Sequence, residues 1–520
     1  MSESTVAIVG SGIVGTTLAY LLTRRGHDVV IFEKGPEYPY PHEAQFREQV
    51  LYLHESGAYR LPPDLMHHTF SGSYTHDLDE ERAMVVGGSA TKWQAVTLRM
   101  APEDFQTRSR YGYGEDWPLT YEELEPFYCR AEELLGVAGT DADNPFAPRR
   151  SRPYPLPPFP LSYDDRILAG RLRAAGIILH TTPQARTSRA YDGRPGCVNY
   201  GTCRVCPIGA RYSPAHHLRL AQRTGRCRVR PQTSVRRIVL ERGRVRALLY
   251  RENESATDQE HAARVIIVAA GAIESARLLL LSAGGAHPDG PGNAGGHVGK
   301  HLIFHHLWAG RMRYRERLFP GRLGPYTGQS YQFRDPPGRG RHGGTKVEFS
   351  AHLTVGPRVR VRETTTGAEI VDAMEEIPHW RVIKLHSESV PGPEKWVGLS
   401  ERRDRFGDPF AHVRYVPADF DHETYRFARE VFDRFVSSTG AVDAHLDEEA
   451  SFTSASHHLG TCRMGRDVRD SVVDSFGRVH GLSNLYVAGG SAFVGTSAVN
   501  PTLTMVALAV RTAGSILRLL

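Results

Sequence analysis

The sequence predicts an α/β fold in which one cofactor-binding domain is assembled from separated segments of the chain. Three stretches each join an apolar, β-type run to a helical pattern. They lie at residues 5–34, 264–282 and 484–517. Alternating stretches at 345–354 and 380–386 predict strands of a second, sheet-based domain. A chain of 520 residues is long enough for two such domains.

The first of these stretches has the pattern of a strand, a tight turn, a helix and a second strand. The turn reads GSGIVG and contains Gly10, Gly12 and Gly15, while Glu33 ends the second strand. The first glycine allows the tight turn, the second lets a pyrophosphate approach the backbone, and the third packs helix on strand. An acid at Glu33 suits a ribose hydroxyl. This element predicts a dinucleotide site without distinguishing FAD from NAD.

Composition argues against several classes of protein and partner. The chain has 64 Lys and Arg against 58 Asp and Glu, without a concentrated basic stripe, so nucleic acid is not an expected partner. The apolar run Val265–Leu281 is interrupted by Glu274 and Arg277, so no membrane span is expected. A strand pattern beginning at Thr5 leaves no room for a signal peptide, which predicts a cytoplasmic location. Self-association into a homo-oligomer stays open.

The C-terminal block and two internal motifs resemble the glucose-methanol-choline (GMC) oxidoreductase family. The block contains HHLGTCRMG (457–465), VVDSFGRVHGLSNLYVAGGS (472–491) and NPTLTMVALAVRTA (500–513). The internal motifs are GGSATKW (87–93) and AAGAIESARLLLLS (269–282), the latter followed by HVGKHL (297–302). Within the family the chain is similar to pyranose oxidases, glycoside 3-oxidases, and gluconate and glucose dehydrogenases. These share Asn-Pro-Thr-Leu-Thr and a Cys-rich Pro-Ile-Gly-Ala stretch.

This resemblance implies a Rossmann-like FAD-binding domain of the glutathione-reductase type and a second, mixed-sheet α+β substrate-binding domain. Residues 1–50, 80–110, 200–310 and 455–520 are expected to form the FAD domain. Residues 51–79, 111–199 and 311–454 are expected to form the substrate domain and its lid segments. The segment Leu318–Arg341 is dense in Gly, Arg and Pro and is expected to be a connecting or lid loop.

The resemblance also implies a catalytic pair. Alcohol oxidation needs a base for the hydroxyl proton and a hydride acceptor on the other side of the reacting carbon. The family's base is the first residue of His-x-x-Gly-Thr, here His457, and its second polar group is the Asn of Asn-Pro, here Asn500. Asn500 cannot act as a base, so it is expected to stabilise developing alkoxide charge. His458 is the alternative base.

Further FAD contacts are implied by the same motifs. Pyranose oxidases carry their covalently bonded histidine where Lys92 stands, so FAD is expected to bind non-covalently. Gln94 stands where those oxidases have threonine, which leaves reactivity with O2 open. The expected contacts outside the first turn are Gly87, Gly88, Ser89, Lys92, Ala270, Gly489, Gly490, Asn500 and Thr502.

Three of the six cysteines, Cys197, Cys203 and Cys206, are clustered. They resemble, at altered spacing, a stretch that holds a three-iron cluster in some dehydrogenases of the family. Two interpretations stay open, an iron–sulfur cluster or reduced thiols without metal, and the absence of a metal is the expectation adopted. Six cysteines in so long a chain are too sparse for a disulfide scaffold.

Together the resemblances imply an FAD-dependent enzyme that oxidises a C2 or C3 hydroxyl of a sugar or glycoside ring to a ketone. Hydride would pass to flavin N5 and electrons onward to O2 or a quinone-like acceptor. Three alternatives remain: an NAD-dependent dehydrogenase, a flavoprotein lyase on the same fold, and a binding protein without redox activity. No motif identifies the individual sugar, so the substrate is a family-level expectation.

Overall fold

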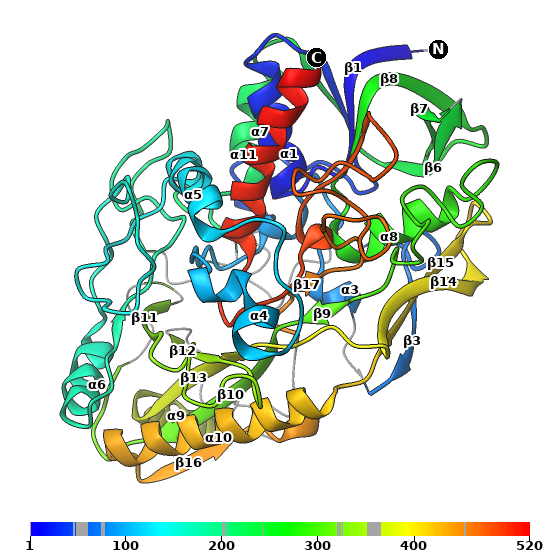
Figure 1. Cartoon of the computed structure of the whole chain (residues 1–520). Coiled ribbons are helices and arrows are strands. Elements are labelled where there is room, and N and C mark those ends of the chain that lie inside the picture. The colour runs from blue at the N-terminus through cyan, green and yellow to red at the C-terminus, as the bar shows by residue number, and fades with distance from the viewer. Residues whose placement is uncertain are drawn as a thin grey trace.

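The computed structural model describes residues 2–44, 47, 61–73, 78–199, 203, 205–241, 243–319, 324, 326–350, 366–451 and 454–520. Two large sheets, each built from segments far apart along the chain, lie in different parts of the molecule (Figure 1).

The main sheet has a parallel core with an antiparallel extension. Strands β5, β2, β1, β8 and β18 pair in parallel, whereas β7 and β6 are antiparallel. The residues Val6–Val9 and Val265–Val268 are apolar and buried, as expected for parallel strands covered on both faces. The strands are β1 (Ser2–Val9), β2 (Val29–Phe32), β5 (Cys227–Arg230), β6 (Thr233–Glu241), β7 (Arg244–Glu252), β8 (Gln259–Val268) and β18 (Leu485–Val487).

Helices cover this sheet and connect it to the rest of the chain. Helix α1 begins directly after the glycine-rich turn and packs against both α7 and α11 (Figure 1). Helix α5 packs on α11 and begins with a capping box formed by Thr120 and Glu123. The helices are α1 (Ile13–Thr23), α5 (Tyr121–Leu135), α7 (Pro214–Gln222), α8 (Gly271–Leu281) and α11 (Thr502–Leu519).

Helix α11 is long and apolar enough to cross a membrane, and it is the one such helix among the described residues. More than half of its residues (56%) are buried inside the protein. Its contacts with α1 and α5 are those of a core helix, which passes the same test of length and composition.

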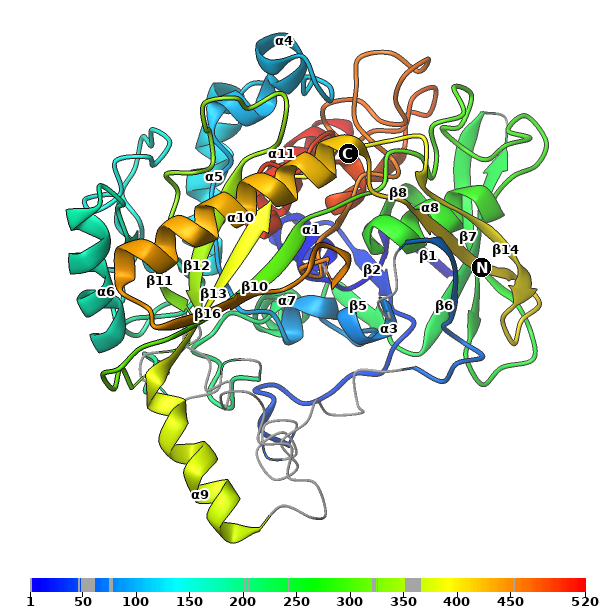
Figure 2. The same ribbon diagram turned by 90° about the horizontal axis from the view of Figure 1, so that it is seen from below.

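The second large sheet is antiparallel throughout, with the order β16-β10-β13-β12-β11-β4. Helix α10 (Asp419–Thr439) crosses one face and contacts α6 (Tyr163–Ala174) (Figures 1 and 2). The strands are β4 (His180–Thr181), β10 (His306–Arg313), β11 (Tyr326–Ser330), β12 (Thr345–Ser350), β13 (Trp380–Ser387) and β16 (Asp443–Leu446). The predicted strands at 345–350 and 380–386 are confirmed, and 351–354 lies outside the described residues.

Strand β12 shows that this sheet has one apolar and one polar face. All six of its residues are buried, yet polar Lys346 and Glu348 alternate with apolar Val347 and Phe349. Successive side chains of a strand point to opposite faces. The apolar face packs against α10, where the Phe349 and Phe435 rings lie 5.9 Å apart. The polar face must therefore be covered by another part of the chain.

The segment expected to be a lid differs from that expectation. Within 318–341 the structure contains β11, whose residues are all buried and which pairs with β12. Arg339 is also buried and forms ion pairs with Asp104 (2.8 Å) and Glu388 (3.2 Å). Residues 320–323 and 325 lie outside the described part of the chain. This Gly- and Arg-rich segment is therefore partly core structure, because the charges of Arg334 and Arg339 are paired and its strand is hydrogen-bonded on both sides.

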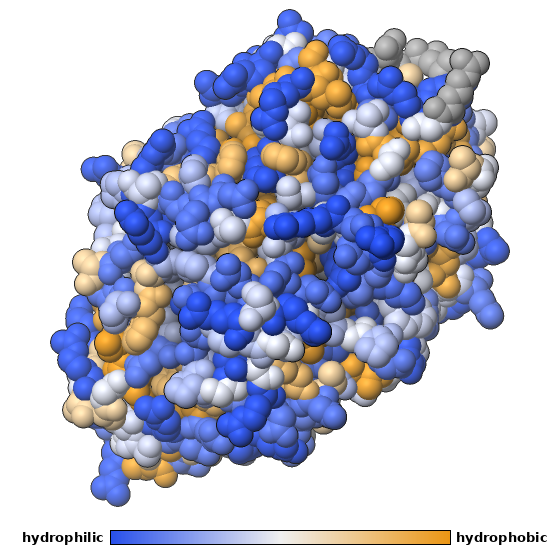
Figure 3. Space-filling view, in the orientation of Figure 1, coloured by the Kyte–Doolittle hydropathy of each residue, from blue (hydrophilic) through white to orange (hydrophobic). Residues whose placement is uncertain are grey.

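The remaining elements are smaller. Strands β14, β15 and β3 form a mixed sheet, and β17 pairs with β9. Helix α9 projects from the body (Figure 2), and the face in Figure 3 shows hydrophilic side chains interspersed with small apolar groups. The bounds are β3 (His68–Gly72), β9 (Ile303–Phe304), β14 (Lys395–Arg403), β15 (Pro409–Tyr415), β17 (His458–Leu459), α3 (Leu78–Glu81), α4 (Thr107–Tyr111) and α9 (Gly367–Glu376).

Candidate active site

The glycine-rich turn joins β1 to α1. A Cβ atom at Gly15 would lie 2.0 Å from the carbonyl oxygen of Gly10, so only glycine allows the helix to come this close. Gly10 has a φ of +98° and stands against the backbone of Ala269. A Cβ atom at Gly12, by contrast, would meet nothing within 4 Å. At Gly12 the turn therefore presents bare backbone to open space, which suits a pyrophosphate.

Glu33 stands beside this turn, just after β2. Its carboxylate accepts hydrogen bonds from Ser11 N (3.1 Å), Ser11 Oγ (2.7 Å) and Gly35 N (3.0 Å). Burial raises the pKa of Glu33, and the hydrogen bonds from Gly35 and Ser11 oppose that rise. The carboxylate thus organises the turn, and its oxygens are acceptors of the kind that a ribose hydroxyl needs.

The segment 87–94 packs directly against the turn. Gly87 N donates to Ser11 Oγ at 3.0 Å, and a Cβ atom at Gly88 would lie 3.0 Å from Gly12 Cα. Both Gly87 and Gly88 have positive φ, +100° and +59°. Two motifs that are far apart in the sequence therefore form one glycine-lined surface.

The polar side chains of the same segment differ in their burial and in their hydrogen bonds to the protein. Ser89 Oγ accepts a hydrogen bond from Ala83 N at 3.1 Å. Lys92 is half-buried and ends the turn Gly88–Thr91. Gln94 Oε1 is buried and has no hydrogen-bond partner among the described residues. An unsatisfied buried carbonyl is costly, so Gln94 offers a position for a ligand donor.

Gly489 and Gly490 bring the C-terminal segment to the same place. Gly489 has a φ of +97°, and a Cβ atom there would lie 3.4 Å from Val14 of α1. The carbonyl of Gly490 accepts a hydrogen bond from Gly460 N at 2.9 Å. The turn after β18 therefore runs between α1 and the segment that carries His457.

Two other predicted FAD contacts stand at helix N-termini. Ala270 precedes the first residue of α8, and Thr502 is the first residue of α11. N–H groups at helix N-termini lack partners inside the helix and can bind acceptor atoms. Ser491 Oγ, which the motif analysis did not single out, is buried without a hydrogen-bond partner among the described residues.

These residues fit FAD. Segments 10–15, 87–88 and 489–490 meet at the start of α1, and their glycines expose backbone where side chains would fill the space. The buried, unpartnered oxygens of Gln94 and Ser491 add polar atoms that need partners. When bound, FAD supplies the electron-accepting ring.

His457 and His458 face different surroundings. Strand β17 pairs with β9, with His458 opposite Phe304, and His458 Nε2 lies 2.8 Å from Glu81 Oε2. The ring of His457 instead lies beside His305, with centroids 4.9 Å apart. His457 Nδ1 is buried without a hydrogen-bond partner among the described residues. The geometry thus favours His457 over His458 as a base, because a carboxylate engages only His458.

The backbone around His457 is strained on both sides. Ala455, Ser456 and Thr461 have φ values of +48°, +58° and +77°. Non-glycine residues rarely adopt this left-handed region, and such strain is concentrated at functional sites. Thr461 Oγ1 also donates to the Ala272 carbonyl at 2.6 Å. The segment that carries His457, just before β17, is therefore held in place on both sides.

A buried cluster on the second sheet links His457 with Asn500. Lys346 lies on β12, directly opposite His386 on β13, and Glu348 is two residues further along β12. Lys346 Nζ donates to Asn500 Oδ1 at 2.6 Å and to the Glu348 carboxylate. His386 Nε2 lies 2.8 Å from Glu348 Oε2, and its ring stacks on His457 with centroids 6.1 Å apart. Both predicted catalytic residues thus contact one cluster.

Burial sets the protonation of this cluster. Burial, followed by the nearby His305 and His386, holds the pKa of His457 well below the ordinary value of 6.5. Burial alone would raise the pKa of Glu348, but His386 and Lys346 hold it below its usual range. Burial lowers the pKa of Lys346, and Glu348 restores part of that loss. At neutral pH His457 is the neutral imidazole, the form that accepts a proton.

The three clustered cysteines lie in a loop of which residues 200–202 and 204 are outside the described part. Among described residues, the one group of three potential metal ligands with atoms within 4.8 Å of one another is Asp192, His216 and His217, so the cysteines do not form such a group. Asp192 Oδ2 lies 2.9 Å from His216 Nε2 and 3.4 Å from His217 Nε2. These atoms are already partners of one another.

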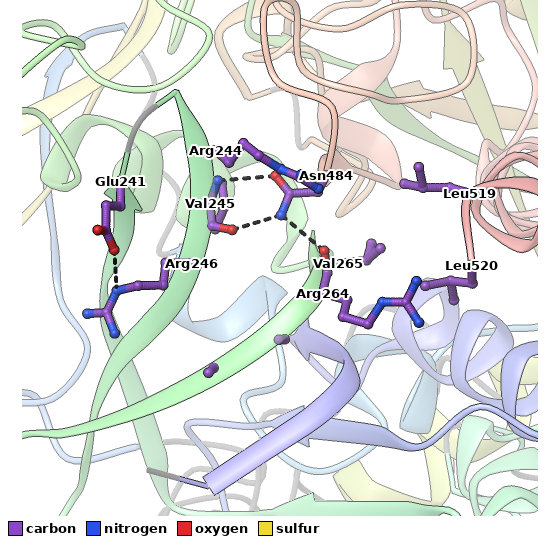
Figure 4. A pocket seen from close by; sticks show the side chains of 11 residues that line it. Glu241, Arg244, Val245, Arg246, Arg264, Val265, Asn484, Leu519 and Leu520 are labelled. Atoms are coloured by element: carbon purple, nitrogen blue, oxygen red, sulfur yellow. Dashed lines mark hydrogen bonds and ion pairs between the residues drawn. The ribbon is translucent and has the colours of Figure 1, made fainter.

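A surface pocket of about 500 Å³ lies at the edge of the main sheet (Figure 4). Arg244, Arg264 and Leu520 line it, and Asn484 bridges the backbones of Val245 and Arg264 there. None of the predicted catalytic or FAD-binding residues lines this pocket, so it is separate from the candidate active site.

Sequence reasoning missed His305, Lys346, Glu348 and His386. In TKVEFS (345–350) the charged residues alternate with apolar ones, which is also the pattern of a strand with a solvated face. Only the tertiary structure, which buries that face, turns the alternation into a site. The available signals were weak: His305 follows the HVGKHL motif, and His386 ends a predicted strand.

Comparison with known proteins agrees with this arrangement. Two models described as GMC oxidoreductase match residues 173–307 and 396–509, and one described as FAD dependent oxidoreductase matches residues 5–131. The large subunit of fructose dehydrogenase from Gluconobacter japonicus is 29% identical and aligns with 98% of this chain and 97% of its own length. The 6'''-hydroxyparomomycin C oxidase from Streptomyces lividus is also 29% identical, over 98% and 91%. Pyridoxine 4-oxidase from Mesorbium loti, at 19% identity, shares the fold, with a TM-score of 0.68 over 99% of both chains.

The matched segments contain the features that the structure brings together. The glycine-rich turn and Glu33 lie in the FAD-dependent match, and His457 and Asn500 lie in the second GMC match. These matches leave no role for NAD as the bound dinucleotide, so that alternative is set aside. The chain belongs to the GMC oxidoreductase family and is an FAD-dependent enzyme that oxidises CH–OH groups.

Proposed function

We propose that this enzyme oxidises a ring secondary alcohol of a sugar or glycoside, converting a C2 or C3 hydroxyl to a ketone. The observation that carries the proposal is the buried cluster in which neutral His457 and Asn500 contact the same polar sheet face. A face with several buried polar groups suits a substrate with several hydroxyls. One relative over nearly the whole chain is named for a sugar, fructose.

Each residue has a defined role in the proposed reaction. His457 accepts the hydroxyl proton, since its lowered pKa keeps it neutral at pH 7. Asn500 donates a hydrogen bond to the substrate oxygen and stabilises the negative charge that develops there. FAD, when bound, would supply the acceptor for the hydride from the same carbon, so that the alcohol would lose two electrons and two hydrogens. The final electron acceptor would be O2 or a quinone-like compound.

We further propose that FAD is held without a covalent bond, because Lys92 stands where pyranose oxidases attach their flavin. Acid precipitation of the holoprotein tests this directly. Yellow colour released into the supernatant is the expected result. A yellow pellet would contradict the proposal.

An anaerobic titration of the yellow holoprotein with pyranoses and aryl glycosides tests the substrate class. Bleaching of the flavin band by a sugar is expected, and His457→Asn should slow it by about 10²- to 10⁴-fold at unchanged FAD content. His458→Asn is the matched control and should still be reduced. A yellow protein that neither sugars nor simple alcohols bleach would favour the lyase alternative, in which FAD takes no part in turnover.

A further inference from the structure

Asn500 has one orientation that its surroundings permit. Lys346 Nζ lies 2.6 Å from the Asn500 side chain. An ammonium group has three donors and no acceptor, so only the amide oxygen can face it. The Asn500 NH2 group must then point away from Lys346. A reversed amide would place donor against donor in a buried site and leave both unsatisfied.

The lysine that imposes this orientation is itself held firmly. Lys346 is fully buried, with 0% of its side chain exposed, and Glu348 is 1% exposed. A buried charge is retained only when it is paired, and Lys346 pairs with the Glu348 carboxylate on the same strand. The other oxygen of Glu348 lies 2.8 Å from His386 Nε2. Because these groups project from paired strands rather than loops, their geometry is rigid.

We propose that Lys346 is a positioning residue, which fixes the Asn500 amide so that its NH2 group faces the reacting hydroxyl. Glu348 keeps Lys346 in place and, through His386, ties Asn500 to the base His457. The inference rests on the proposed roles of His457 and Asn500. The further point is that the buried Lys346–Glu348 ion pair of the second large sheet orients the Asn500 NH2 group, which stabilises the alkoxide.

A purely structural role for Lys346 is the competing explanation, and a double-mutant cycle separates the two. Lys346→Met should lower the rate constant for anaerobic flavin reduction by roughly 10- to 100-fold with little change in substrate affinity, because the lost interaction matters most in the transition state. In an Asn500→Ala background the same substitution should change the rate by less than about twofold. Equal losses in both backgrounds would overturn the proposal.

Thermal melting of the same four proteins tests the bond without any substrate. Asn500→Ala should lower the melting temperature more in the protein with Lys346 than in the Lys346→Met variant. In the first case the buried Lys346 ammonium loses its Asn500 partner, whereas in the second no ammonium is present. Equal changes would contradict the Lys346–Asn500 bond. If no sugar reduces the wild-type flavin, the proposed substrate class fails, and the melting cycle still decides whether the two side chains are coupled.

Lys395→Met is the matched control. Lys395 is equally buried and paired with a carboxylate, that of Asp421, and it has no bond to Asn500. This variant should lose stability while retaining its rate of flavin reduction per bound FAD. If Lys346→Met does not fold, Lys346→Leu replaces it in the cycle, because leucine also lacks a donor for Asn500. A Lys395→Met rate as low as that of the Lys346 variant would indicate a general effect of losing a buried lysine.

Discussion

The glycine-rich turn and the buried cluster that we propose to be catalytic are built in different ways. At the turn, the contacts of Gly15 with Gly10 and of Glu33 with Ser11 lie within one strand–helix–strand unit, so they are set by local sequence. The catalytic cluster instead joins β12, β13 and the C-terminal block, and its charges lie on strands that alternate with apolar residues. A site made by one local unit is therefore visible in the sequence, whereas a site made by covering a polar sheet face is not.

The largest effect is expected at the cluster, from loss of the proposed base His457. His457→Ala should lower the rate constant of flavin reduction by about 10²- to 10⁴-fold, the usual contribution of general base catalysis. Stopped-flow absorbance under anaerobic conditions measures it, and FAD content should be unchanged. His458→Ala, which breaks a contact with Glu81, should retain most of the rate. A reversed order of the two losses would move the base to His458.

The turn can be broken in two distinguishable ways. Gly15→Ala should prevent folding or strongly lower the melting temperature of the apoprotein, because the new Cβ would lie 2.0 Å from a backbone oxygen. Gly12→Ala should leave that temperature unchanged, because nothing lies within 4 Å. Its FAD affinity, measured by fluorescence titration, should fall at least about tenfold, since the methyl group occupies space needed by the pyrophosphate. Normal FAD affinity in Gly12→Ala would place the cofactor elsewhere.

Stability should fall in acid because of the buried histidines. Burial lowers the pKa of His305 to about 3 and that of His306 to about 4, against 6.5 for an ordinary histidine. Below pH 6.5 the unfolded chain binds protons that the folded chain does not. Each group then costs about 1.4 kcal/mol of stability per pH unit until its folded pKa is reached. Urea unfolding at pH 7 and pH 5 measures the loss, and a larger stability at pH 5 would contradict it.

The smallest expected effect is a shift in the pH dependence of catalysis. Because burial holds the pKa of His457 well below 6.5, the acid limb of kcat/KM should lie below that pH. His305, His386 and Lys346 lower this pKa further, whereas Glu348 raises it. Lys346→Met removes a positive charge and should move the acid limb to higher pH. Glu348→Gln should move it lower, and shifts of the opposite sign would contradict the arrangement of charges.

Much of the fold could be predicted because it depends on local patterns. The turn, Glu33 and strands β12 and β13 follow from spacing and alternation, and His457 and Asn500 follow from family motifs. The buried strand β11 could not be predicted, because glycine and arginine around it are typical of loops. The Lys346–Asn500 bond could not be predicted either, because it joins residues whose proximity arises only when the second sheet meets the C-terminal block.

In the proposed reaction a sugar CH–OH group loses a hydride from its carbon and a proton from its oxygen at the site containing His457. The most direct test is the rate of anaerobic flavin bleaching by a pyranose carrying deuterium at C2 or at C3. Slower bleaching with deuterium at one of these carbons, and bleaching at least about 100-fold slower in His457→Ala, is the predicted result. Equal rates for labelled and unlabelled sugars, or an unchanged rate of bleaching in His457→Ala, would contradict this reaction.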